Sequence, residues 1–288
     1  MPFERFVAID WSGAKGRGQS GIEVAEIEWD SPHPRFVPCP NARRWSREDV
    51  AELVARPTKT PTLFGLDFAF SVPWQESCGR PNEVMDTKAL WALVDRLCIS
   101  APHMYAGPIW TSPKSPFVPY ILHSTSGRGD FYDHRNLRMV EQLEGRAISI
   151  YHMVGVQVGA GSFAGMRMLH QISQSHAAKI AIWPFDEVDG TKTAIVEIYP
   201  SSFYRKAGSR RPSKEELTRC DFEQIDRTLE YYGCKRSTDT VCRSVDQADA
   251  LISAAALRST AGSGAFKFPD GHTFELREGW IFGVPTRF

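Results

Sequence analysis

The sequence predicts an α/β protein. Apolar, β-prone segments fill the first seventy residues and return near residues 180–199, whereas apolar residues at helical spacing follow from residue 87 onward. Hydrophobic residues make up 42% of the 288 residues and charged residues 24%, which indicates a globular protein with a full core. No apolar run reaches the ~20 residues of a membrane helix, and residues 1–5 precede no signal-peptide stretch. We therefore expect a cytoplasmic protein with no membrane contact.

Four strands and one helix are expected in the first seventy residues. A capping pattern at Ser46 begins the helix. Alternating apolar and acidic residues indicate that the second strand is half-exposed, and two prolines place the third strand at an edge. In order, the segments are strands at 6–10, 21–29 and 36–45, the helix at 46–56, and a strand at 62–67.

The middle of the chain has a different composition. Proline, glycine, histidine and aromatic residues are frequent between about residues 74 and 190. We predict a long, largely helical insertion there, between the fourth and fifth core strands of one domain that spans residues 1–288. Helices are expected at 87–98, 137–143 and 166–172, strands at 179–183 and 193–199, helices from Ser213 and over 244–260, and an apolar, extended segment at 278–285.

Charge and cysteine content exclude two simple assignments. The 34 basic and 34 acidic residues cancel, so the net charge gives no general indication of nucleic-acid binding. The six cysteines contain no Cys-x-x-Cys pair and indicate neither a zinc site nor a disulfide framework. Any surface that binds phosphates must therefore be local.

Acidic residues occur where apolar residues are expected. Asp10 and Asp67 each end an apolar strand, and Glu197 interrupts another. Asp246 and Asp249 lie three residues apart in the first turns of an apolar helix, and therefore share one of its faces. Burying a charged carboxylate costs free energy, and carboxylates that lie close together raise each other's pKa. A bound Mg²⁺ or Mn²⁺ ion relieves both effects. The pattern predicts a divalent-cation site.

Each of these acids also has a purely structural interpretation. Asp10 suits a turn before Trp11, Asp246 complements a helix dipole, Asp249 can face solvent, and Glu197 has Arg205 and Lys206 as candidate partners. Five separate explanations are then needed, whereas one site accounts for all five residues.

Five segments of the chain, in order and over nearly its whole length, resemble domain-of-unknown-function family 429, which is described as predicted RNase-H-like nucleases. The Asp-x-x-Asp-Ala-Leu segment is also similar to the last catalytic motif of Holliday-junction resolvases. The matching segments are VAIDWSG at 7–13, GLDFAFSVP at 65–73, EIYP at 197–200, DQADAL at 246–251 and EGWIFGV at 278–284.

This resemblance implies a ribonuclease H-like fold, a mixed five-stranded sheet flanked by helices in which the first and fourth strands are neighbours. Asp10 and Asp67 would then lie side by side, next to the helix that carries Asp246 and Asp249. It further implies a metal-dependent nuclease that hydrolyses phosphodiester bonds with two Mg²⁺ or Mn²⁺ ions. Asp10, Asp67 and Asp249 are the expected metal ligands, and Asp246 and Glu197 complete the expected catalytic set.

Basic residues supply the candidate contacts to a nucleic-acid partner. Their densest cluster lies at residues 205–214, and Lys15 follows the first strand. Phosphate contacts would suit these side chains, although solvated charge runs and a solvated hairpin turn are the alternatives. The expected substrate-binding residues are Lys15, Arg205, Lys206, Arg210 and Arg211.

Three other functions compete with the nuclease. A catalytically silent RNase-H-like binding module would keep the fold and lack turnover. Residues 10–16 resemble the first phosphate loop of actin-like and sugar kinases, which favours a nucleotide-dependent phosphotransferase, although no second loop is evident. Residues 159–164 fit a loose dinucleotide fingerprint typical of oxidoreductases, or simply a glycine-rich helix entry.

Overall fold

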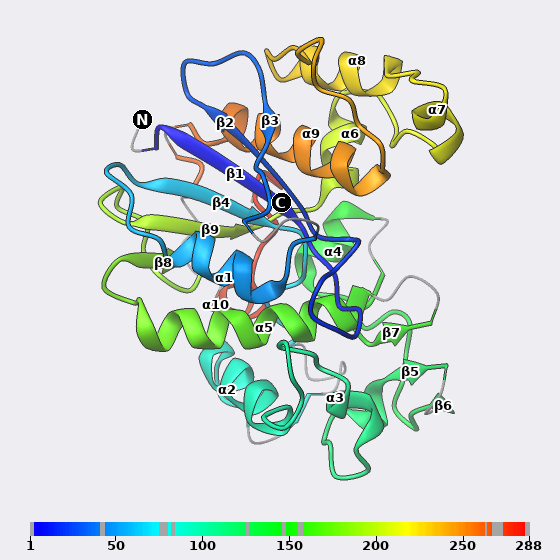
Figure 1. Ribbon diagram of the computed structural model, residues 1–288. Helices are drawn as coiled ribbons and strands as arrows, with labels where there is room; N and C mark the ends of the chain where they lie inside the picture. Colours follow the sequence, from blue (N-terminus) through cyan, green and yellow to red (C-terminus); the bar gives the residue numbers. More distant parts are fainter. Residues whose placement is uncertain are drawn as a thin grey trace.

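A mixed six-stranded sheet forms the centre of the computed structural model, in the order β3-β2-β1-β4-β9-β8 (Figure 1). β1, β4, β9 and β8 run parallel, and β2 is antiparallel to both β1 and β3. The strands are β1 (Arg5–Asp10), β2 (Glu23–Glu28), β3 (Arg35–Phe36), β4 (Thr62–Leu66), β8 (Ile180–Ile182) and β9 (Thr193–Glu197). The structure describes residues 3–40, 44–74, 80–81, 84–124, 127–145, 148–154, 158–262, 264–266 and 273–285.

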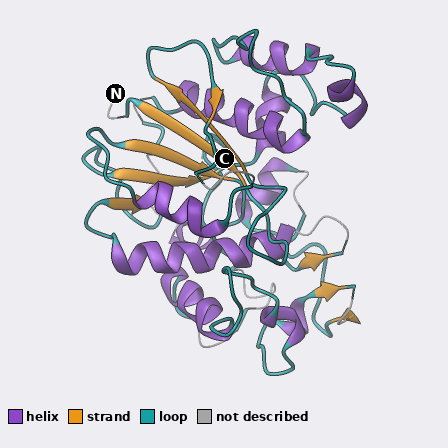
Figure 2. Ribbon diagram, viewed as in Figure 1, coloured by secondary structure: helices purple, strands orange, loops and turns teal. Residues whose placement is uncertain are grey.

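Helices cover both faces of this sheet (Figure 2). One face carries α9 (Val245–Thr260), which packs on β1 and β2, with α6 (Pro200–Lys206), α7 (Lys214–Thr218) and α8 (Glu223–Tyr231) on the same side. The other face carries α1 (Arg47–Ala55) and α5 (Val158–Ser175), and α2 (Thr87–Leu97) packs on α5. The expected α/β class is thus confirmed.

The two covered faces explain why the first strand reads as a continuous apolar run. Phe6 and Ala8 belong to the core beneath α9, whereas Val7 and Ile9 belong to the core beneath α1 and α5. Because successive side chains of a strand point to opposite faces, a strand covered on both sides must be apolar at every position. Because β1 is buried along most of its length, Asp10 at its end is buried as well.

The segment between β4 and β8 contains a second, three-stranded sheet in the order β6-β5-β7. In Figure 1 this sheet lies at the lower right, apart from the main sheet. The remaining elements are α3 (Pro108–Thr111), η2 (Val118–Tyr120), β5 (Leu122–His123), β6 (Gly127–Arg128), α4 (Met139–Glu144), β7 (His152–Met153) and, near the C-terminus, α10 (Thr273–Glu278).

The strand count is one place where the structure differs from the expectation. The expected sheet has five strands, but β8 adds a sixth at the edge beside β9. Since β8 lies inside the predicted insertion at 74–190, the connection from β4 to the next strand of the sheet covers residues 67–179. A strand was expected at residues 179–183, but the sequence does not reveal which strand it pairs with.

Two strand predictions also need correction. The second strand is buried, not half-exposed, because α9 covers it and Glu26 is neutralised by ion pairs with Arg5 and Arg35. The third shrinks to the two residues of β3, since the prolines that follow cannot donate ladder hydrogen bonds. The expected N-caps are confirmed at Ser46 and Ser213, and Ser244 is the N-cap of the helix expected over 244–260; each of the three accepts a backbone N–H. No helix in the described ranges is long and apolar enough to cross a membrane.

Candidate metal centre

Asp10 and Asp67 meet where two parallel strands end together. β1 and β4 pair in register as far as Ile9 and Leu66, and the N–H of Asp67 donates to the carbonyl of Ile9 at 3.0 Å. The two side chains consequently lie within hydrogen-bonding reach of each other. Two carboxyl groups in such contact share a proton or require a cation between them.

Asp246 and Asp249 approach the same point from α9. This helix begins at the N-cap Ser244 and packs along β1 and β2, so its first two turns face the ends of the strands. Asp249 is 2% exposed and Asp10 8% exposed. Asp246 and Asp249 both raise the pKa of Asp10, and Asp246 also raises the pKa of Asp67. Asp67 in turn raises the pKa of Asp249. The structure therefore brings the four predicted aspartates together.

The pKa values of these aspartates record their crowding. Burial and the charges of its three neighbours raise the pKa of Asp10 well above its ordinary value. Burial raises the pKa of Asp67 to about 6, against the opposing influence of Arg211. Burial, with Asp67 and Asp246, raises the pKa of Asp249 to about 8, again opposed by Arg211. At neutral pH the cluster thus binds protons that a divalent cation could replace.

Arg211 is the one predicted substrate-binding residue whose ion pair lies in this cluster. Its guanidinium forms an ion pair with Asp249 Oδ2. Burial acts to lower the pKa of Arg211, but the carboxylates of Asp249, Asp67 and Asp10 outweigh it and raise that pKa. Arg211 is 42% exposed at its side chain, whereas Asp249 is 2% exposed. Arg211 therefore reaches inward from the surface to neutralise the acids.

The donor set suits a hard divalent cation. Asp249 Oδ1 and Tyr204 Oη are both buried, and these two side chains lie within hydrogen-bonding reach of each other. Carboxylate oxygens, which Asp10, Asp67, Asp246 and Asp249 supply, are what Mg²⁺ and Mn²⁺ prefer. Within the part of the chain that the structure describes, no three or more His, Cys, Asp or Glu side chains are arranged to hold a metal ion as they stand. Since Arg211 already holds Asp249 Oδ2, a cation reaches the whole of this carboxylate only after Arg211 moves.

Glu197 has a different role from the four aspartates. It ends β9 and is 2% exposed. Arg138 Nη1 donates to Glu197 Oε2 at 2.8 Å and Arg138 Nη2 pairs with Oε1, while Arg138 Nε donates to Glu141 at 2.9 Å. The partner is thus Arg138, and neither Arg205 nor Lys206. Glu197 still acts on Asp67 through space and raises its pKa.

We expect the Arg138 network to be critical for stability. Arg138→Met would leave the buried carboxylates of Glu197 and Glu141 without their cation, which costs about 3–5 kcal/mol of unfolding free energy. The matched control is Arg135→Met, because Arg135 pairs with Asp133 while 78% exposed, and such surface pairs contribute about 1 kcal/mol or less. Urea unfolding of both variants is the measurement, and equal losses would contradict the prediction.

Most of the predicted basic patch is engaged with other groups of the protein. Arg205 pairs with Glu144, Lys206 Nζ donates to the carbonyl of Gly283 at 2.6 Å, and Arg210 pairs with Glu216 at 2.6 Å. Lys15 is exposed on the loop between β1 and β2. The cluster that the sequence suggests at 205–214 is therefore not a free basic surface, apart from the exposed Lys214 and the inward-facing Arg211.

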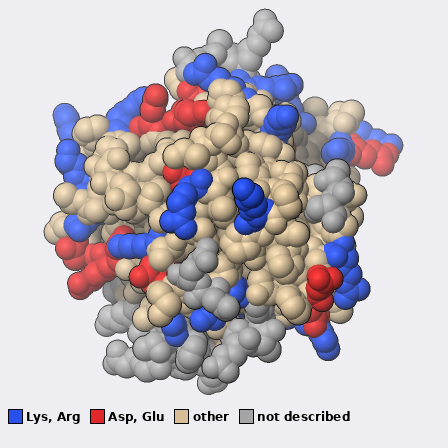
Figure 3. All heavy atoms as spheres, turned by 90° about the horizontal axis from the view of Figure 1, so that it is seen from below, with Lys and Arg blue, Asp and Glu red and all other residues tan. Residues whose placement is uncertain are grey.

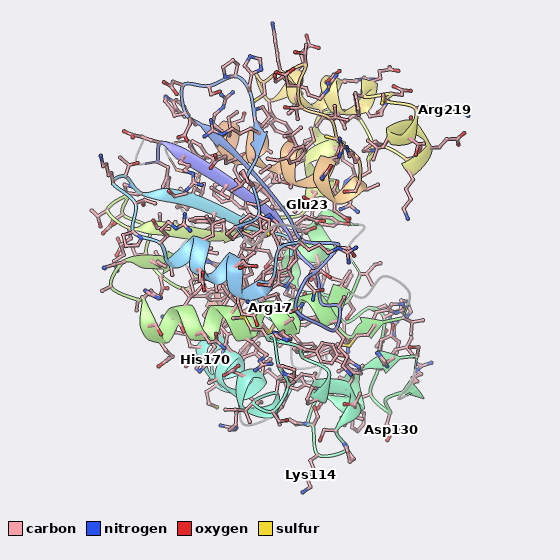
Figure 4. The ribbon with its side chains drawn as sticks, in the orientation of Figure 1. Arg17, Glu23, Lys114, Asp130, His170 and Arg219 are labelled. Atoms are coloured by element: carbon pink, nitrogen blue, oxygen red, sulfur yellow. The ribbon has the colours of Figure 1, made fainter. Side chains whose placement is uncertain are left out.

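Glu23 is an acidic group near the cluster that the sequence analysis missed. It begins β2 directly opposite Asp10, and Gln247 Nε2 donates to its carboxylate at 3.4 Å. Burial raises the pKa of Glu23, with a smaller contribution from Asp246. Figure 4 shows Glu23 near the middle of the molecule, in contrast to Arg219 at its outer edge. The alternation of β2 suggested a solvent-facing side chain, and only the pairing register reveals its neighbour.

The loop after Asp10 lies against the start of α5. Trp11 Nε1 donates to the carbonyl of Gly161 at 2.9 Å. A Cβ on Gly13 would lie 2.3 Å from backbone atoms of Ala160, and one on Gly159 would lie 2.0 Å from the carbonyl oxygen of Ile150. Gly13 thus lets the loop approach the helix, and Gly159 of the candidate dinucleotide fingerprint has a packing role against Ile150.

A pocket of about 500 Å³ opens beside the carboxylates. Asp67 and Arg211 belong both to the aspartate cluster and to the lining of this pocket. The loop at residues 11–14, the first turn of α5 and the Arg138–Glu197 pair form other parts of its wall. A ligand in the pocket would therefore contact Asp67, Glu197 and Arg211, whereas Asp10, Asp246 and Asp249 lie outside the lining.

Comparison of the chain with protein-family models, with curated proteins and with solved structures finds no match in any of the three. The assignment to an RNase-H-like family therefore stays a prediction from the sequence motifs. What can be said of function comes from the residues and their arrangement.

Proposed function

We propose that the protein is a divalent-metal-dependent phosphodiesterase of the RNase-H-like type. The observation that carries the proposal is the cluster of Asp10, Asp67 and Asp249, whose pKa values are all raised by burial and by neighbouring charge. Perturbed carboxylates beside a pocket are typical of functional sites. The pairing of the first strand with both the second and the fourth also agrees with the fold that the sequence motifs imply.

Asp10, Asp67 and Asp249 would hold Mg²⁺ or Mn²⁺, with Asp246 beside them as a ligand or as a hydrogen-bonding partner. When bound, divalent cations lower the pKa of water and stabilise negative charge on a leaving oxygen. In the net reaction, water oxygen forms a bond to phosphorus, the bond to one ester oxygen breaks, and that oxygen gains a proton. The products are a phosphate monoester and an alcohol.

Two groups of this chain would assist without holding metal. Arg211 lines the pocket while its Nη2 pairs with Asp249, and its other N–H groups would neutralise a phosphate there. The Arg138–Glu197 pair keeps the end of β9 fixed beside Asp67. Glu197 is therefore a positioning residue in this proposal.

The test is hydrolysis of thymidine 5′-(p-nitrophenyl phosphate), followed by release of p-nitrophenolate, with Mn²⁺, with Mg²⁺ and with EDTA. We expect turnover with either metal and none with EDTA. Metal binding without turnover would support the silent binding module instead. Hydrolysis of ATP with no cleavage of the diester would support the phosphotransferase.

Arg211→Gln is expected to increase the affinity for Mn²⁺ about fivefold at pH 8.5, because the variant no longer competes for Asp249. The pH is chosen above the wild-type pKa of Asp249, about 8, because the loss of Arg211 raises that pKa further and protons would compete more strongly at a lower pH. Melting temperature against Mn²⁺ concentration gives the affinity. Arg210→Gln, one residue away and paired with Glu216, is the matched control. Unchanged or weaker Mn²⁺ binding in Arg211→Gln would contradict the prediction.

A further inference from the structure

The pocket beside the carboxylates is lined by both charged and apolar side chains. The charged residues of the lining are Asp67, Arg138, Glu141, Glu197 and Arg211. Apolar side chains supply other parts of the wall, among them Phe68, Ala69, Ile148, Val158, Ile198 and Ile281. This combination suits a ligand that joins a phosphate to a flat, weakly polar group.

The volume sets the size of that ligand. About 500 Å³ falls within the range of pockets that enclose one small molecule. One nucleoside phosphate has this size, and it combines a base with a phosphate. The base stacks on apolar and aromatic surface, while the phosphate pairs with a guanidinium. A base-paired duplex does not fit into such a pocket.

The surrounding charges also argue against a long polynucleotide. Binding to a polynucleotide depends on several phosphate contacts along a basic track. Arg205, Lys206 and Arg210 are engaged within the protein, and the total charge is zero. On the face shown in Figure 3, Lys and Arg side chains lie scattered among uncharged and acidic residues and form no continuous band.

We propose that this pocket binds a single nucleoside phosphate unit, so that the protein cleaves short phosphodiesters or chain ends and spares the interior of long strands. Only the cleavage step rests on the proposed function. Binding of the nucleoside phosphate does not, because Arg211 and the apolar side chains of the pocket would supply its contacts.

Binding is tested first, in EDTA. Thymidine 5′-monophosphate is expected to raise the melting temperature of the wild-type protein in a saturable manner. Ile148→Trp, at a pocket-lining position that is 43% exposed, should abolish this shift by filling the space. The matched control is Ile99→Trp, at a position that is 78% exposed and outside the pocket, where the shift should persist. Ser201→Trp fills the pocket from α6 and serves as a second blocking variant.

Turnover is tested with two esters that share one leaving group. Thymidine 5′-(p-nitrophenyl phosphate) and methyl p-nitrophenyl phosphate differ only in the group that would enter the pocket. With Mn²⁺ we expect kcat/KM to favour the thymidine ester at least about a hundredfold. Ile148→Trp should reduce this preference at least tenfold, mainly through KM, and Ile99→Trp should leave it unchanged.

The source of the nucleotide unit is tested with linear and circular single-stranded DNA of one sequence. Release of mononucleotides from the linear strand alone would identify chain ends as substrates, and cleavage of dinucleotides alone would identify short diesters. Cleavage of the circle as fast as the linear strand would overturn the inference, as would a missing melting shift in the wild type. A shift with thymidine 5′-monophosphate but no hydrolysis of any ester would refute only the proposed function.

Discussion

Asp10→Asn is expected to lower Mn²⁺-dependent hydrolysis of the thymidine ester by at least about a hundredfold while the protein stays folded. Asp10 lies at the centre of the cluster, where Asp67, Asp246 and Asp249 all act on it. The amide keeps the shape of the side chain but carries no charge, and it binds a hard cation poorly. The loss should therefore appear in the metal affinity and in turnover together.

The same change should stabilise the metal-free protein at neutral pH, because it removes a buried acid from among like charges. Asp30→Asn is the matched control, since Asp30 is exposed at the turn after β2. Initial rates against Mn²⁺ concentration, together with urea unfolding in EDTA, measure both effects. Full activity in Asp10→Asn would contradict the assignment of the cluster, whatever the stability.

The second large effect is a pH dependence of stability in EDTA. The pKa of Asp67 is raised to about 6 and that of Asp249 to about 8, so the folded protein holds these protons more tightly than the unfolded chain does. Their contribution to stability is complete below the ordinary pKa of an aspartate near 4, and it is lost as pH rises through about 6 and about 8. We expect a loss on the order of 3 kcal/mol between pH 6 and pH 8, where Asp249 is protonated in the folded protein but ionised in the unfolded chain.

Asp249→Asn isolates the contribution of one group. The variant keeps no titrating proton at this position, so its unfolding free energy relative to the wild type should increase steadily from pH 5 to pH 8.5. Urea unfolding in EDTA at half-unit pH steps gives the difference. Mn²⁺ should reverse the trend more strongly for the wild type than for the variant, because the variant has lost one of the three carboxylates expected to hold the cation. A difference that does not change with pH would show that Asp249 is charged in the folded protein throughout.

The sequence predicted the elements of the main sheet better than their surroundings. Apolar segments that end in Asp10 and Asp67, and the apolar segment that Glu197 interrupts, marked the three central parallel strands, because burial on both faces leaves a clear signal. The strand at 36–45 was overestimated, and β8 was left within the insertion. Pairing partners depend on long-range contacts, which a local pattern does not contain.

In the candidate site, too, local features could be predicted and long-range contacts could not. The four aspartates could be grouped from their positions at strand ends and on one helix face. Arg138 could not be predicted as the partner of Glu197, since the two residues lie far apart in the chain and only the fold brings them together. The basic residues at 205–214 looked like one surface, but their nearest acids, such as Glu144 and Glu216, determine where they point.

The contact between Trp11 and Gly161 has a consequence for how this protein can be divided. The loop that follows Asp10 is held by α5. Arg47 also connects this loop to residue His103, because its guanidinium donates to the carbonyls of Ser12, Ala14 and His103. Both α5 and His103 lie in the segment between β4 and β8. Although this segment interrupts the sheet in sequence, it cannot be removed as a detachable accessory. A truncated chain that retains all six strands would keep the carboxylates and lose one side of the pocket wall.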